Sequence, residues 1–186
     1  NMAFWTDATG ADPKRADRWV LEFGSIPQWL AKKVTKPSFT INPVEHTYLN
    51  HKFYYPGGLT WEPVTMTLVD PVQPDAAATL MRLLEEGGYS PPASENDLQT
   101  ISKNAFVAAV GSVKIHQIDE TGDLANAIET WHLTNAWISS LKFGDLEYGT
   151  EEMSNIDIEL RYDFAHVVTK FPGVLGGNSF PTSLSY

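Results

Sequence analysis

The side chains in this sequence that could do chemistry are five histidines and two adjacent pairs of glutamates. The histidines lie at positions 46, 51, 116, 132 and 166, in separate segments and without the short spacing of metal ligands. Glu85 adjoins Glu86, and Glu151 adjoins Glu152, but neighbouring carboxylates seldom converge on one substrate as an acid and base pair must. The chain has no cysteine, which excludes a thiolate nucleophile, a disulfide and a cysteine-ligated metal. These residues predict no metal site.

Other sequence features of enzymes are also missing. The sequence contains no glycine-rich phosphate loop, no nucleophile elbow and no dinucleotide fingerprint. We therefore expect no enzyme and no cofactor. An active site assembled from distant residues stays open as an alternative, in the form of a β-barrel enzyme or a small-ligand-binding module. Such a protein would be a monomer with a concave apolar pocket.

The charge of the chain limits its partners. Lysine and arginine are outnumbered 13 to 23 by aspartate and glutamate, which gives a net charge of −10. Proteins that bind nucleic acid tightly need a basic surface to neutralise the phosphates. We therefore expect no tight nucleic-acid binding.

Length and composition predict a globular protein. The chain has 186 residues, of which 42% are hydrophobic, enough for one domain with its own core. We expect the core over residues 17–166, with an N-terminal arm at 1–16 and a C-terminal arm at 167–186. The longest apolar run, from Ala105 to Gly111, is far shorter than the roughly 20 residues that cross a bilayer. The sequence therefore predicts no membrane anchor.

The clearest element is a strand over residues 155–164. Its apolar and charged residues alternate strictly, and alternate strand side chains point to opposite faces. The apolar set is Ile156, Ile158, Leu160, Tyr162 and Phe164, and the charged set is Asp157, Glu159, Arg161 and Asp163. The charged face alone is typical of the wet side of an antiparallel sheet.

The elements around this strand predict a mainly β fold. Alternating patterns indicate strands over 17–24 and 61–69, a strand from Phe39 that Pro43 ends, and a hairpin joining 112–119 to 127–133. One helix is expected over residues 74–87, with Asp75 at its N-terminus and glycines at its end. Residues 98–109 could be helical or irregular. The expected fold is an antiparallel β-barrel or sandwich with one flanking helix.

One segment has more aromatic surface than one subunit can cover, and two adjacent aromatics near the N-terminus are expected to dock on this subunit or on a neighbour. The segment from Val44 to Leu59 reads as a loop with a turn at Pro56-Gly57-Gly58. Exposed aromatic patches commonly mark an interface. The predicted contact residues are Phe4 and Trp5 in the N-terminal arm, with Tyr48, His51, Phe53, Tyr54 and Tyr55 in this segment.

The order and spacing of several motifs resemble the tail tube proteins of contractile phages. The motifs are Trp131-x-Leu133-x-Asn135-Ala136-Trp137, then Phe143-Gly144-x-Leu146-x-Tyr148, then Ile156-x-Ile158-x-Leu160-x-Tyr162-Asp163, with an earlier match at Leu49–Gly57 and Trp61–Pro71. The matches span residues 17–166. The same tube fold is used by tailocins and by the haemolysin-coregulated tube protein of type VI secretion.

This resemblance implies a mechanical function. Proteins of this kind form hexameric rings that stack into a hollow tube within a contractile sheath. The implied partners are further copies of the chain, the sheath protein, and the baseplate and tail-terminator proteins. The implied location is the virion tail, assembled in the cytoplasm of the bacterial host, and DNA would pass through without tight binding. A tailocin or secretion-system tube, or a baseplate tube initiator, is the nearest alternative.

The resemblance also changes the interpretation of the charged strand face. It implies that this face lines an enclosed channel. The expected lumen residues are Asp157, Glu159, Arg161 and Asp163, with Lys114 and His116 as neighbours. Three acids less one base would give this strand a net −2 per subunit.

Overall fold

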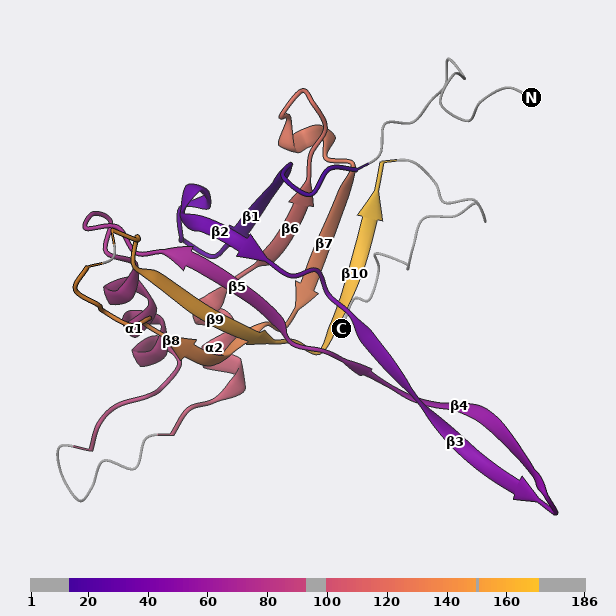
Figure 1. Cartoon of the computed structure of the whole chain (residues 1–186). Coiled ribbons are helices and arrows are strands. Elements are labelled where there is room, and N and C mark those ends of the chain that lie inside the picture. The colour runs from indigo at the N-terminus through magenta and orange to yellow at the C-terminus, as the bar shows by residue number, and fades with distance from the viewer. Residues whose placement is uncertain (1–13, 93–99, 150, 171–186) are drawn as a thin grey trace, which may run out of the picture.

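Two antiparallel sheets and a long projecting hairpin make up the protein (Figure 1). The computed structural model describes residues 14–92, 100–149 and 151–170. Sheet A has the order β1 (Trp19–Phe23), β6 (Val113–Gln117), β7 (Glu129–Thr134) and β10 (Phe164–Thr169). Sheet B has the order β2 (Ala31–Val34), β5 (Val64–Val69), β9 (Asn155–Arg161) and β8 (Trp137–Lys142). The hairpin, here called the arm, pairs β3 (Phe39–Tyr48) with β4 (His51–Trp61).

The two sheets pack face to face around one core. Sheet A contributes Leu21, Ile115 and Leu133, and sheet B contributes Met66, Ile158 and Leu160, all in one buried cluster. Strict alternation places these residues inward and their polar neighbours outward. The sheets are not closed into a barrel, so the mainly β prediction is confirmed as a sandwich.

The strand predicted over 155–164 is confirmed in its alternation but ends earlier. Ile156, Ile158 and Leu160 are fully buried on β9. The backbone then leaves sheet B, and Asp163 donates its N–H to Thr134 O in sheet A at 3.0 Å. Phe164 belongs to β10, where 38% of its surface is exposed. The turn at Tyr162-Asp163 links the two sheets.

The expected strand over 61–69 is two strands. Trp61 ends β4, and Val64 begins β5 after Pro63, as expected for a proline at a strand start. Only one side of β5 is buried, through Val64, Met66 and Leu68. The threonines on the other side face outward.

The prediction of a loop over 44–59 was wrong. Pro56, Gly57 and Gly58 lie within β4, and the turn falls at Leu49-Asn50, where Leu49 has a φ of 54°. Pro43 does not stop its strand either, because it faces Pro56 at a shift in register. Proline has no backbone N–H to donate. Because the two prolines face each other, the missing hydrogen bonds fall at one position of the hairpin, and the strands stay paired on either side of it.

Two short helices lie side by side at one end of the sandwich (Figure 1). The predicted helix is confirmed as α1 (Ala76–Glu86), where the Asp75 carboxylate accepts the N–H of Ala78 at 2.9 Å. The sequence allowed either a helix or an irregular segment over residues 98–109. The structure has the helix α2 there (Lys103–Val110), which Ser102 caps. A Cβ added at Gly87 would lie 2.0 Å from the Phe106 ring, so a glycine lets the helices approach. One-turn 3₁₀ helices cover Gln28–Leu30 and Leu124–Asn126.

Among the described residues, no helix is long and apolar enough to cross a membrane.

Candidate assembly surfaces

The arm is a two-stranded ribbon that extends away from both sheets (Figure 1). Every residue from Thr40 to Thr60 is exposed. An isolated two-stranded ribbon is at best marginally stable in water. The predicted contact residues Tyr48, His51, Phe53, Tyr54 and Tyr55 all lie on the arm, with more than two fifths of each tyrosine and phenylalanine exposed.

The pairing register divides the arm into an aromatic face and a polar face. Val44 lies opposite Tyr55, His46 opposite Phe53, and Tyr48 opposite His51, which places these six side chains on one face. The other face pairs Glu45 with Tyr54 and Thr47 with Lys52, and Lys52 forms an ion pair with Glu45 at 2.9 Å. The aromatic face therefore has no cover within the part of the chain that the structure describes.

The outer face of sheet B carries charges of both signs. Asp157, Glu159 and Arg161 point outward from β9 as expected, and Asp157 accepts a hydrogen bond from Thr67 Oγ1 at 2.6 Å. The register adds Lys33 and Lys142 to the same face, in one row with Asp157. This face thus holds two acids and three bases, which differs from the net −2 expected of the strand.

Asp163 lies apart from this face. Its carboxylate accepts hydrogen bonds from Lys103 Nζ at 2.6 Å and from Asn135 Nδ2 at 2.8 Å. The Lys103 hydrogen bond, with that of Asn135, lowers the pKa of Asp163. The residue therefore ties the β9–β10 turn to α2 and to the turn after β7, where Asn135 adopts a φ of 55°.

The other two expected lumen residues, Lys114 and His116, point outward from sheet A. Lys114 Nζ donates to both oxygens of Glu22, at 2.8 and 3.0 Å, and His116 Nε2 lies 3.5 Å from the same carboxylate. The hydrogen bond from Lys114, then that from Ser112, lowers the pKa of Glu22 to about 2. The outer faces of the two sheets point to opposite sides of the sandwich. One subunit therefore cannot present Lys114 and Asp157 to the same channel.

Two histidines stack on the outer face of sheet A. The rings of His132 and His166, opposite each other on β7 and β10, are parallel within 2° with centroids 4.7 Å apart. Burial, followed by the charge of His166, lowers the pKa of His132. This shift favours the neutral form of His132.

A buried ionic cluster that the sequence did not predict centres on Glu129. Lys36 Nζ donates to Glu129 Oε1 at 2.8 Å, and Lys14 and the Trp131 indole also donate to this carboxylate. Burial works to raise the pKa of Glu129, but these hydrogen bonds outweigh it and lower the pKa to about 2. The sequence feature that indicates this cluster is that Glu129 shares the inward face of its strand with Trp131 and Leu133.

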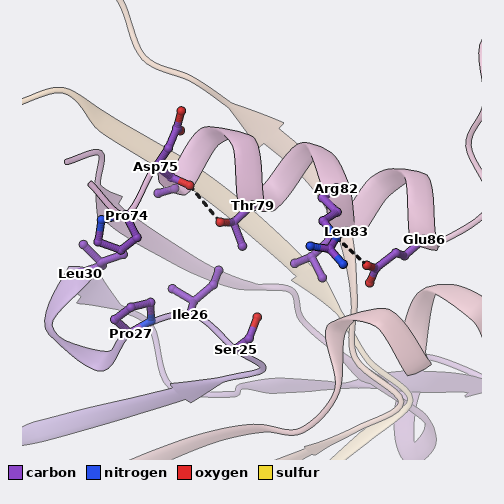
Figure 2. Close-up of a pocket in the computed structure, with 11 residues that line it drawn as sticks. Ser25, Ile26, Pro27, Leu30, Pro74, Asp75, Thr79, Arg82, Leu83 and Glu86 are labelled. Atoms are coloured by element: carbon purple, nitrogen blue, oxygen red, sulfur yellow. Dashed lines mark hydrogen bonds and ion pairs between the residues drawn. The ribbon is translucent and has the colours of Figure 1, made fainter. Parts of the chain in front are cut away.

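A pocket of about 390 Å³ lies between α1 and the segment after β1 (Figure 2). On the helix side of the pocket, Thr79 donates to the Asp75 carbonyl and Arg82 pairs with Glu86, both at 2.9 Å. No group of three or more potential metal ligands occurs among the described residues. Phe4 and Trp5, the other predicted contact residues, lie outside the described residues.

The sequence matches no protein-family model and no curated protein. In structure, a chain of the anti-feeding prophage (AFP) tube-terminating cap superposes with a TM-score of 0.64 at 16% identity, covering 88% of this chain and 95% of its own. A chain of the PVC extracellular contractile injection system, from its sheath–tube complex, gives 0.61 at 16% identity, over 84% and 92%. A chain of the AFP baseplate gives 0.60 at 17% identity, over 86% and 97%.

These neighbours are chains of an anti-feeding prophage and of an extracellular contractile injection system, and the likeness extends over most of this chain and nearly the whole of each neighbour. The fold resemblance expected from the motifs is thereby confirmed. The protein shares its sandwich fold with these chains of the AFP cap, the AFP baseplate and the PVC sheath–tube complex.

Proposed function

We propose that this chain is a tube protein of a contractile, phage-tail-like particle, with six subunits in each ring and rings stacked into a hollow tube within a sheath. The observation that carries the proposal is the fold itself, which matches a chain of a sheath–tube complex over 84% of the sequence. Sheath, baseplate and terminator proteins would be its partners, because the neighbouring structures are a sheath–tube complex, a baseplate and a terminating cap. The function would be mechanical and would require no cofactor.

The strand directions support a cyclic assembly. Each sheet has four strands, and every neighbouring pair is antiparallel. The two edge strands of a sheet therefore run in opposite directions. When copies are related by rotation about an axis, β8 of one copy meets β2 of the next in an antiparallel sense, and β10 meets β1 in the same way. Such head-to-tail pairing closes a ring and removes unpaired edges.

The arm supports stacking of these rings. It leaves sheet B at the end where β2 stops and β5 starts, and it extends beyond that end (Figure 1). Its aromatic face is too large to stay in water in a stable assembly. We assign it to contacts with a neighbouring ring, where it would bury Tyr48, Phe53 and Tyr55.

One outer sheet face would then line the bore, and we assign that role to sheet B. Its outward side chains are charges of both signs among threonines and serines, including Thr65, Thr67 and Ser139. Such a wall is mainly polar and hydrated, with Trp137 opposite Arg161 as its large apolar side chain. The face of sheet A, which has His132 and His166 with Val168, would point outward.

Electron microscopy and native mass spectrometry of the purified chain test the proposal. The expected result is rings of six copies, and tubes at high concentration. A chain that stays monomeric at every concentration and salt condition, with and without a sheath protein of the same particle, would overturn it. A ligand that raises the melting temperature of such a monomer would favour the rival binding module instead.

A further inference from the structure

The loop that joins β8 to β9 exposes large apolar side chains next to acids. Leu146, Tyr148 and Met153 are 92%, 106% and 71% exposed. Between and beside them lie the exposed acids Asp145, Glu151 and Glu152. The loop spans residues 143–154, of which all but residue 150 are described, and is here called the acidic loop. Side chains this exposed gain nothing from the fold of their own subunit, which is typical of an interface.

The opposite edge of sheet B carries a complementary surface. Trp29 is 64% exposed at the start of this edge, and Lys32 and Lys33 follow it on β2. Beside Trp29 lies an open pocket of about 610 Å³, partly lined by Trp19 and Val20. Trp29, Lys32 and Lys33 are here called the basic edge. Lys32 reaches Asn155 Oδ1 at 3.3 Å, an exposed hydrogen bond that leaves two of its three donors for other partners.

The sheet register puts the two surfaces at the same height. Lys33, Thr67, Asp157 and Lys142 form one row across β2, β5, β9 and β8. The acidic loop begins directly after Lys142, and Trp29 lies shortly before Lys33 in the direction of the same sheet end. When β8 of one copy lies beside β2 of the next, the acidic loop therefore reaches the basic edge of that copy.

The charges distinguish this arrangement from a symmetric dimer. Residues 28–34, which carry the basic edge, include two bases and no acid, whereas residues 143–154 of the acidic loop include four acids and no base. A two-fold dimer that paired either side with itself would bring like charges together. Head-to-tail contact pairs each acidic side with a basic one.

We propose that the acidic loop of one copy packs on the basic edge of the next copy in the ring. Leu146 and Tyr148 lie against Trp29 and its pocket, and Glu151 and Glu152 face Lys32 and Lys33. This contact rests on the proposed ring. It sets the direction in which subunits follow one another around the ring, and it identifies the residues that select this direction. The apolar side chains supply the buried area, and the charges reject wrong orientations.

Charge reversal on each surface gives a direct test. Glu151→Lys with Glu152→Lys makes the loop basic, and Lys32→Glu with Lys33→Glu makes the edge acidic. Each variant alone should self-associate at least about tenfold more weakly than wild type at low ionic strength, since two attractive pairs become repulsive. An equimolar mixture of the two variants should regain rings with alternating subunits, because each loop then meets an edge of opposite charge. Native mass spectrometry identifies the alternation from the two masses.

The matched control is Glu85→Lys with Glu86→Lys, an adjacent exposed pair on α1 with the same change in charge. It should assemble as wild type does. Circular dichroism should show that all variants are folded. The contact would be overturned if wild type forms rings and none of the charge reversals weakens them, or if the mixture of variants fails to form rings. Either result would leave the proposed tube function standing. A wild-type chain that never associates would overturn both.

Discussion

Lys36 and Glu129 are 93 residues apart in the sequence, yet Lys36 Nζ lies 2.8 Å from Glu129 Oε1. The glutamate side chain is 8% exposed and the lysine 45%. Lys36 follows β2 of sheet B, and Glu129 begins β7 of sheet A, so the pair joins the chain between β2 and the arm to the opposite sheet. Lys36 also donates to Gln117 Oε1 at 2.6 Å. The base of the arm is thus fixed by a buried carboxylate.

Glu129→Gln should lower the free energy of unfolding by about 3 kcal/mol at pH 7, the equivalent of a pKa lowered from 4.5 to about 2. Because the folded pKa is the lower one, this stabilisation is present above pH 4.5 and is lost as the pH falls toward 2. Urea unfolding at several pH values measures it. The wild-type and variant curves should converge at low pH. Glu120→Gln, at a side chain 71% exposed, is the control, and an equal loss there would refute the cluster's role.

His132→Phe should reduce the loss of stability at acidic pH. The folded pKa of His132 is lowered by burial and by His166. Its neutral form therefore stabilises the fold above pH 6.5, and this contribution is lost as the pH falls through the folded pKa. Phenylalanine keeps a ring that stacks on His166 but takes up no proton. Melting temperatures at pH 7.5 and pH 5.5 should differ less in the variant than in wild type. His46→Phe, on the exposed arm, should retain the wild-type difference.

Replacing Tyr48, Phe53 and Tyr55 with serine should leave the sandwich folded and prevent tube growth. These residues share the aromatic face of the arm and lie outside the core. The matched control replaces Glu45, Lys52 and Tyr54, on the polar face, with serine. The two variants should have similar melting temperatures, and electron microscopy should show tubes only for the control. Normal tubes from the first variant would contradict the assignment of the aromatic face to ring stacking.

Single cysteines can identify the face that lines the bore, because the chain has no cysteine of its own. In assembled tubes, Asp157→Cys on sheet B should react with a small maleimide but be protected from a maleimide carrying a large polymer. Thr130→Cys, on the outer face of sheet A, should react with both. Dissociated subunits should react with both reagents at both positions. The reverse pattern in tubes would exchange the roles of the two sheets.

Strand periodicity was readable from the sequence because alternation is a local property. The buried set Ile156, Ile158 and Leu160 was recognised correctly, and so was the hairpin that joins β6 to β7. The helix α1 was recognised from its aspartate cap and its terminal glycines. Each of these signals lies within one strand, helix or hairpin, where side-chain direction follows directly from backbone geometry.

The arm was misread because its signals compete. Prolines and glycines within Val44–Leu59 normally indicate a turn, but here Pro43 and Pro56 face each other and the ladder continues past them. The residue that turns is Leu49, with a positive φ that few leucines adopt. Which two residues of a long segment face each other depends on the pairing register, and the sequence does not state it.

Along each strand, the positions of apolar and charged side chains can be read from the sequence. Which of these charges share a surface depends on how the strands are arranged in the folded protein. This arrangement separated Asp163 from Asp157, added Lys33 and Lys142 to the same row, and put Lys114 on the opposite side of the sandwich. The physical reason is that alternation gives a side chain's face within its own strand, whereas the order of strands in a sheet is set by packing between segments that are far apart in the chain.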